Sequence, residues 1–286
     1  MDRGLAPAKV NLALHVTGVR PDGYHALDSL VAFAGIGDTV TARPARALTL
    51  AVDGPFAAGV PSGEDNLVLR AARALAEARG VEARAAIRLT KSLPHAAGIG
   101  SASSDAAATL RALADLWGVE PLAPHDPEVL GLGSDVPACL HAPSPVRMRG
   151  RGEALEPVAL VRGPPPGLVL VNPGVPLPTR AVFAALAQRS SPPLPPLPEA
   201  GTAHDLAAWV AGARNDLQAP AEALAPEVAA ALAHLRRAPG VLAAVMSGSG
   251  ATCVGIARDV ATAGRAARAI QVASRSWWVA SGPMLA

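Results

Sequence analysis

Alternating apolar and polar positions predict that the chain begins with strands. In residues 5–16 apolar side chains recur at every second position, and Lys9 and Asn11 lie on the opposite face. The dipeptide Asp22-Gly23 is typical of a turn after this strand. Further strands are expected at residues 27–34, 39–43, 48–52 and 83–90.

Apolar side chains that recur at helical spacing predict two helices in the first half of the chain. Residues 66–79 are rich in strong helix formers and are followed by Gly80, a residue typical of helix ends. The segment SSDAAATLRALADLW predicts a second helix, which begins at Ser103 and ends at Gly118. A glycine- and serine-rich loop at residues 94–104 leads into it.

The second half of the chain mixes helices and strands around a proline-rich break. The predicted strands are 167–171, 241–246, 252–257 and 277–281, and the predicted helices are 179–188, 204–213, 226–237 and 260–273. The stretch SSPPLPPLPEAG at residues 190–201 cannot continue a helix. These elements predict an α+β protein of two lobes, with an N-terminal domain at residues 1–160 and a C-terminal domain at 161–286.

Composition excludes several classes of protein. The 286 residues are 50% hydrophobic with a formal net charge of +2, which excludes wholesale disorder and argues against a nucleic-acid or membrane-surface binder. Cys139 and Cys253 form no CxxC pair, and the histidines show no metal-ligand spacing, so no structural metal is expected. The longest uncharged run, residues 238–257, contains Pro239 and four glycines, and the first residues lack the layout of a signal peptide. We therefore expect a cytoplasmic protein.

Lysine is rare in this chain, which makes its two lysines informative. Of the 25 basic residues only Lys9 and Lys91 are not arginine. A lysine retained in an arginine-rich chain indicates a need for a compact ammonium group. Lys9 also lies near Asn11 and the single tyrosine, Tyr24. The simpler interpretation is an exposed lysine on an edge strand and a half-buried tyrosine beside a turn.

The loop at residues 94–104 has the composition of an anion site. Gly98 and Gly100 let the backbone come close to a ligand, and hydroxyl residues lie where the second helix begins. The chain has no GxxxxGK[ST] sequence, and the loop lacks the third glycine of GxGxxG. On these residues alone, phosphate binding and simple helix capping by Ser103 or Ser104 are equally supported.

Two other segments are candidates for the same chemistry. The turn SGSGAT at residues 247–252 closes either on a ligand or only on itself as a hairpin. Asp135 follows a turn in GLGSDVPACL, where an aspartate either caps a helix or accepts or orients the proton of a substrate hydroxyl.

Taken together, these segments resemble the GHMP kinase family. PAKVNLALHV is similar to its first motif, LPHAAGIGSASSDAA to its phosphate-loop motif, and MSGSGATCVGI to its C-terminal motif. RPDGYHALDSL resembles members whose alcohol substrate carries a cytidine diphosphate group, and EDNLVLRAA, GSDVPACL and VNPGVPLPTRAVF support the same subgroup. The resemblance runs from Leu5 to about Ile256.

The resemblance implies a fold and an activity. The fold is an N-terminal domain of the ribosomal-S5-domain-2-like type with a C-terminal α/β sandwich domain. The activity is ATP-dependent phosphorylation of a small-molecule alcohol, with Mg²⁺ arriving on ATP, no tightly bound cofactor, and a monomer or homodimer as the working form. The alternatives are a kinase for a mevalonate- or homoserine-like alcohol, which has no base to stack, or a non-catalytic binding protein of this fold.

The resemblance also implies roles for individual residues. Lys9 and Asp135 are the implied catalytic pair, Asn11 lies beside them, and Tyr24 and Phe183 sandwich the cytosine while His25 bonds to its edge. On its own, Phe183 is better interpreted as a core residue. The implied ATP-binding residues are Asn66, Leu67, Pro94, His95, Ala96, Ala97, Gly98, Ile99, Gly100, Ser101, Ala102, Ser103 and Ser104. The family's loop usually carries more glycine than Ala96, Ser101 and Ala102 provide, and where the backbone needs a positive φ their side chains would weaken ATP binding.

Overall fold

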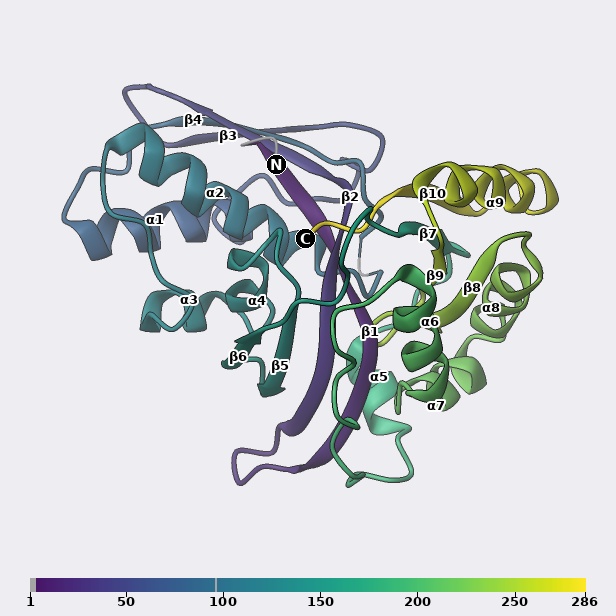
Figure 1. Cartoon of the computed structure of the whole chain (residues 1–286). Helices are drawn as coiled ribbons and strands as arrows, with labels where there is room; N and C mark the ends of the chain where they lie inside the picture. The colour runs from purple at the N-terminus through teal and green to yellow at the C-terminus, as the bar shows by residue number, and fades with distance from the viewer. Residues whose placement is uncertain (1–3, 96) are drawn as a thin grey trace. The chain divides into compact units, whose positions relative to one another are not determined.

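The computed structural model describes residues 4–95 and 97–286, which form two compact units (Figure 1). Unit 1 comprises residues 4–8, 37–95 and 100–142, and unit 2 comprises residues 9–36, 97–99 and 143–286. The units therefore alternate along the chain. The predicted boundary at residue 160 is a division along the sequence, and it stays a prediction.

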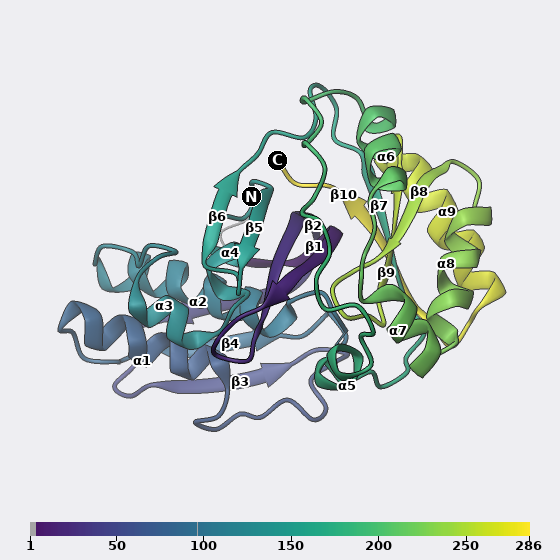
Figure 2. The same ribbon diagram turned by 90° about the horizontal axis from the view of Figure 1, so that it is seen from below.

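Two long strands, β1 (Leu5–Val19) and β2 (His25–Arg43), begin the fold and pair with each other (Figures 1 and 2). The tight turn predicted between them is confirmed, with Gly23 at φ +81° and the Tyr24 amide donating to the Asp22 carboxylate. The two strands predicted at 27–34 and 39–43 are one strand. The intervening residues include two glycines, and the chain stays extended through them.

Unit 1 places helices beside a short sheet. The end of β2 pairs antiparallel with β4 (Ala86–Thr90), which pairs parallel with β3 (Thr49–Asp53). Helix α1 (Leu67–Arg79) is confirmed, ending at Gly80 with φ +64°. Apolar side chains of α1 and α2 (Ser101–Trp117) share one core with Ile87 and Leu89. The short helices α3 (Pro127–Leu132) and α4 (Val136–Leu140) were not predicted, because five or six residues show no helical period.

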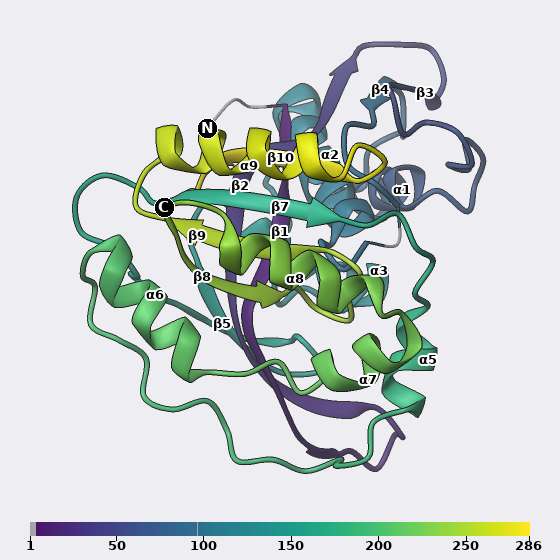
Figure 3. The ribbon, with the colours of Figure 1, turned by 90° about the vertical axis from the view of Figure 1, so that its right-hand side faces the viewer.

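Unit 2 contains an antiparallel sheet of order β10-β7-β9-β8 (Figure 3). Its strands are β7 (Gly167–Asn172), β8 (Val241–Met246), β9 (Cys253–Ala257) and β10 (Trp278–Pro283), all close to their predicted places. Helices α8 (Glu227–Arg237) and α9 (Val260–Ala273) pack on this sheet and contribute to its core. The hairpin predicted around SGSGA is confirmed as β8–β9.

The rest of unit 2 is less regular. Helix α6 (Ala203–Gly212) is confirmed, whereas α5 (Thr179–Ala184) is shorter than predicted. Helix α7 (Gln218–Leu224) and strands β5 (Val146–Gly150) and β6 (Ala154–Pro157) were not predicted; β5 pairs with β2 and with β6. Residues 190–200 contain no helix or strand, as their prolines predict. Among the described residues no helix is long and apolar enough to cross a membrane.

Candidate active site

Three sequence motifs that lie far apart in the chain meet within unit 2. The backbone N–H of Lys9 donates to the carbonyl of Ile99 at 3.0 Å. The N–H of Asn11 donates to the Ser247 hydroxyl at 3.0 Å, and that hydroxyl donates to the Gly98 carbonyl at 2.8 Å. The first strand, the middle of the glycine-rich loop and the SGSGAT turn therefore form one hydrogen-bonded unit.

The approach of the loop to the turn requires glycine. Gly98 has φ +74°, and a β-carbon on it would lie 2.6 Å from the carbonyl oxygens of both Ser247 and Gly250. The Thr252 amide also donates to the Ala97 carbonyl at 3.2 Å. The turn is thus a hairpin, as one of the two interpretations of the sequence has it, and it also holds the loop. Its closing on a ligand stays a prediction.

The side chain of Lys9 is buried and oriented. Its exposed fraction is 4%, which rules out the interpretation of an exposed edge-strand lysine. Its ammonium donates to the Asn11 side-chain oxygen at 3.1 Å, and the Asn11 amide donates to the Ser29 hydroxyl at 2.7 Å. Because Ser29 in turn donates to the Ala13 carbonyl, a chain of hydrogen bonds fixes the Asn11 amide and directs its oxygen to Lys9.

In unit 1 the helix after the loop begins without a side-chain cap. Gly100, at φ +59°, is the N-cap residue of α2, and no side chain accepts from the helix start there. The alternative that Ser103 or Ser104 caps this helix is wrong, because the helix already begins at Ser101 and the Ser104 hydroxyl donates to the Pro7 carbonyl at 2.7 Å. The first-turn N–H groups therefore lack a capping side chain, and together with the helix dipole they suit an anion.

The helical position of Ser101 and Ala102 corrects one expectation about the loop. Both residues lie in the first turn of α2, where the backbone has ordinary right-handed geometry. Their side chains are therefore not forced into a positive φ, and they impose no strain of that kind. Ala96, the third substituted position, lies outside the described residues.

Asp135 and Asn66 both precede helices in unit 1, and they behave differently. Asp135 is half-buried at the N-cap of α4, but its side chain makes no capping hydrogen bond. Asn66 does cap α1: its side-chain oxygen accepts from the Val68 amide at 2.8 Å and its amide donates to the Pro61 carbonyl at 2.5 Å. Asn66 therefore fixes the start of α1 and the position of the neighbouring Leu67.

The residues expected to hold a cytosine base lie in unit 2. The rings of His25 and Phe183 stack with centroids 4.8 Å apart and an interplanar angle of 26°. Tyr24 is 56% exposed, and the guanidinium of Arg151 lies 3.8 Å from the centre of its ring. Arg151 was not predicted, because cation–π pairing between distant residues leaves no pattern in the sequence.

His25 carries a buried ring nitrogen. Its Nε2 atom has no hydrogen-bond partner among the described residues. Burial lowers the pKa of His25 from its usual value, and the positive charge of Arg189 adds to this effect. The ring is therefore neutral at pH 7 and offers one donor and one acceptor, depending on its tautomer.

Within the described part of the chain, no three His, Cys, Asp or Glu side chains gather as they would around a metal ion. Mg²⁺ usually enters kinase sites on the substrate phosphates with one or two carboxylates, and keeps several waters. A half-buried carboxylate such as Asp135 fits that requirement.

Comparison with known proteins identifies the family. Models of the GHMP kinases N terminal domain and the GHMP kinases C terminal match residues 66–142 and 197–273. A 4-diphosphocytidyl-2-C-methyl-D-erythritol kinase of Cereibacter sphaeroides is 56% identical over 98% of each chain, and one of Dinoroseobacter shibae is 52% identical over 97% of this chain and 93% of its own.

Solved structures match over the full length as well. A crystal structure of 4-(cytidine 5'-diphospho)-2C-methyl-D-erythritol kinase aligns with a TM-score of 0.80 and 35% identity, covering 99% of this chain and 98% of its own. A homoserine kinase from Cytophaga hutchinsonii aligns with a TM-score of 0.63 at 19% identity, covering 98% and 95%, and shares the fold alone. The two-domain fold expected from the sequence motifs is thus confirmed, and the chain belongs to the GHMP kinase family.

Proposed function

We propose that this chain transfers the γ-phosphoryl group of ATP to the C2 hydroxyl of 4-diphosphocytidyl-2-C-methyl-D-erythritol, a step of the non-mevalonate route to isoprenoid precursors. The observation that carries the proposal is the 56% identity, over 98% of both chains, to a relative named for this activity. The mevalonate and homoserine kinases that share the fold are 11–19% identical, so no comparable observation favours their substrates.

The glycine-rich loop and the start of α2 bind the ATP phosphates in this proposal. One feature supports it: α2 begins without a capping side chain. The N–H groups of the first turn then donate to phosphate oxygens, and the helix dipole favours the negative charge. Asn66 and Leu67 lie near the adenine, and Mg²⁺ enters bound to ATP.

Lys9 and Asp135 carry out the chemistry. Asp135 accepts or orients the proton of the C2 hydroxyl, which makes its oxygen a better nucleophile. The ammonium of Lys9 stabilises the negative charge that develops during transfer. The bond from Lys9 to Asn11, at 3.1 Å, supports this role because it gives the ammonium a fixed direction.

The cytidine group is bound by Tyr24, His25 and Phe183. Aromatic rings gain free energy by stacking on a base, and a neutral histidine can hydrogen-bond to the edge of cytosine. The unpartnered Nε2 of His25 supports this role, as does the ring of Phe183 lying against His25. The enzyme then acts in the cytoplasm on small molecules, as a monomer or homodimer, without nucleic-acid or membrane partners.

A substrate panel tests the proposal. Purified protein with Mg-ATP is given the cytidyl substrate, mevalonate or homoserine, and ADP release is measured for each. We expect turnover only with the cytidyl substrate. Turnover with mevalonate or homoserine instead would assign the chain to another kinase of the family, and ATP binding without turnover on any alcohol would favour a non-catalytic role.

A further inference from the structure

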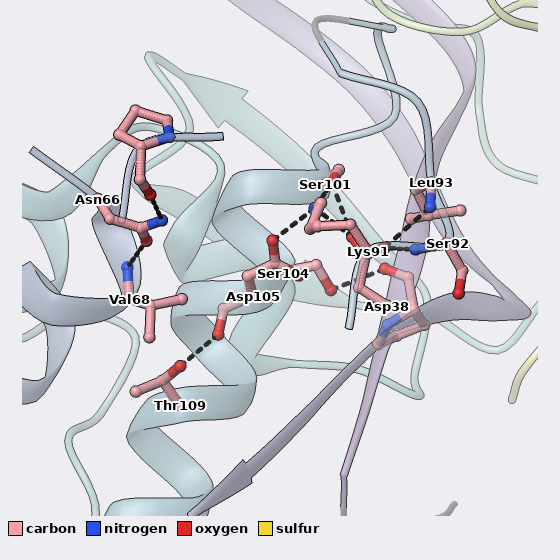
Figure 4. A network of polar contacts seen from close by, with 12 residues as sticks. Asp38, Asn66, Val68, Lys91, Ser92, Leu93, Ser101, Ser104, Asp105 and Thr109 are labelled. Carbon is pink, nitrogen blue, oxygen red and sulfur yellow. Dashed lines mark hydrogen bonds and ion pairs between the residues drawn. The ribbon is translucent and has the colours of Figure 1, made fainter. Parts of the chain in front are cut away.

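The second lysine of the chain lies in a buried cage of acidic and hydroxyl groups in unit 1 (Figure 4). Lys91 follows β4 directly, and its side chain is 2% exposed. Its ammonium donates to the carboxyl groups of Asp38 and Asp105, the latter at 2.7 Å, and to the hydroxyl of Ser101. A single buried cation is thus surrounded by groups from β2 and from the first turns of α2.

Asp38 connects the two ends of the glycine-rich loop. One of its carboxylate oxygens accepts from the backbone N–H groups of Ser92 and Leu93, at 2.6 and 2.9 Å. The other oxygen accepts from Lys91 and from the Ser101 hydroxyl, the latter at 2.8 Å. Ser92 and Leu93 come directly before residues 94–100, and Ser101 comes directly after them.

We propose that Lys91 and Asp38 form a clamp that sets the geometry of the phosphate loop, with Lys91 as a positioning residue for ATP. This inference rests on the proposed function, in which residues 94–104 bind the ATP phosphates. Asp38 is fully buried and Lys91 nearly so. Their charged groups form hydrogen bonds with each other, with Ser101 and with the backbone. The clamp therefore acts through the loop, by fixing where the loop leaves β4 and where α2 begins.

The clamp explains why lysine is retained at position 91. Its ammonium is a compact point charge, and three acceptors from two elements converge on it within a closed core. A guanidinium is planar and larger, and no open space is left for it at a side chain that is 2% exposed. Removing the cation leaves buried carboxyl groups uncompensated, so the ends of the loop lose their common anchor.

Replacing Lys91 tests the clamp. We expect Lys91→Met to raise KM for ATP by about tenfold or more, because displacing a bound group by about 1 Å can cost 10²-fold. KM for the cytidyl alcohol stays within about twofold. Lys91→Arg does not restore ATP affinity. In nucleotide-free protein, hydrogen–deuterium exchange of residues 94–104 rises in Lys91→Met, which loss of a direct ligand contact alone would not cause.

Two further variants separate positioning from loss of stability. Arg147→Met removes a partly buried ion pair in unit 2, from Arg147 to Asp28 at 2.7 Å. We expect this variant to have a lower Tm and an unchanged KM for ATP. Ser101→Ala removes only the hydroxyl that joins α2 to Asp38, and it decides the question if Lys91→Met does not fold. We expect Ser101→Ala to raise loop exchange in the nucleotide-free protein and to raise KM for ATP several-fold.

Exchange in the wild-type protein distinguishes failure of the phosphate site from failure of the clamp. A non-hydrolysable ATP analogue is expected to protect residues 94–104. Absence of that protection would overturn the phosphate site and the clamp with it. Protection in the wild type, combined with unchanged loop exchange and unchanged KM for ATP in Lys91→Met or Ser101→Ala, would overturn the clamp and leave the proposed function standing.

Discussion

At the scale of single residues, burial changes the ionisation of Asp105. Asp105 is 3% exposed, and burial raises its pKa to about 8, with the nearby Asp38 adding to the rise and Lys91 opposing it. Asp105 is therefore protonated in the folded protein at neutral pH, and ionised in the unfolded chain.

The shifted pKa of Asp105 predicts a pH-dependent effect on stability. Because the folded pKa of about 8 lies above the ordinary 3.8, the folded state binds the proton more tightly, and this group lowers the free energy of unfolding as pH rises from about 4 to 8. Asp105→Asn is neutral at every pH and keeps an oxygen for Lys91. We expect its Tm to exceed that of the wild type by a few degrees at pH 8.

Thermal unfolding of both proteins from pH 5 to pH 8 checks this expectation. The Tm difference between Asp105→Asn and the wild type should narrow as pH falls toward 5, because the unfolded Asp105 then also gains its proton. A difference that stays constant across this range would mean that Asp105 is ionised in the folded protein.

The stacked pair of His25 and Phe183 predicts a change in affinity for one substrate only. Phe183→Leu keeps an apolar side chain but removes the ring that lies 4.8 Å from His25. We expect KM for the cytidyl substrate to rise by about tenfold, since stacking contributes about 0.5–1.5 kcal/mol and Phe183 also positions His25. KM for ATP is the internal control, and an equal rise in both constants would contradict a role in base binding.

At the scale of elements, the glycine-rich segments have the least freedom to change. Gly98 combines a positive φ with a close approach to the SGSGAT turn. Gly59 also has a positive φ, of +81°, but a β-carbon on it would meet no other atom within 4 Å. Substitutions at these two positions separate the free-energy cost of a positive φ from the cost of a steric clash. Strain at a positive φ alone is about 1–2 kcal/mol.

Gly98→Ala and Gly59→Ala form a matched pair. We expect Gly59→Ala to lower the free energy of unfolding by about 1 kcal/mol with KM for ATP unchanged. Gly98→Ala forces the loop away from the turn, because its β-carbon would lie 2.6 Å from two carbonyl oxygens. It should therefore lower stability further and raise KM for ATP. Equal effects of both substitutions on stability and on KM would contradict the close approach of the loop to the turn.

The elements that could be predicted from the sequence are those that span several repeats of the hydrophobic period or have a clear end residue. Helix α9 was predicted with its observed bounds, and α1 with its end at Gly80, because each shows several helical turns and a defined stop. The short elements α3, α4 and α7 show too few residues for a period to emerge. The break predicted within β2 failed because glycine permits a turn without requiring one.

The segments of the site could be identified from the sequence, but the distant residues that contact them could not. Lys91 was conspicuous as one of two lysines, but Asp38 and Asp105 are ordinary among 23 acidic residues, and only the fold brings them to Lys91. The same holds for Arg151, whose contact with Tyr24 joins positions far apart in the chain. Buried ion pairs and cation–π contacts depend on tertiary packing, which no local pattern records.

At the scale of the whole molecule, the chain order and the compact units do not coincide. Unit 2 takes residues 9–36 from the start of the chain, including Lys9, Asn11 and His25, and joins them to the C-terminal half. This arrangement brings the first motif, Gly98 and the SGSGAT turn into one hydrogen-bonded group although they are up to 236 positions apart. A simple cut of the chain at residue 160 would separate Asn11 from the turn to which it donates.

The interleaved chain predicts that isolated segments do not function. A fragment ending at residue 160 lacks β8, β9 and Ser247, to which Asn11 donates, and it loses the sheet that forms the core of unit 2. We expect this fragment to be poorly folded and to bind no ATP, as measured by circular dichroism and by calorimetric titration. A fragment that folded cooperatively and bound ATP would contradict the interdependence of these segments.

The central claim is that Asp135 and Lys9 serve phosphoryl transfer to a cytidyl alcohol, and ADP release by the wild type and Asp135→Asn tests it most directly. With Mg-ATP and 4-diphosphocytidyl-2-C-methyl-D-erythritol, we expect wild-type turnover and a loss of about 10²-fold or more in Asp135→Asn, with ATP affinity retained. Turnover in Asp135→Asn equal to the wild type, or no turnover by the wild type on this substrate, would contradict the claim.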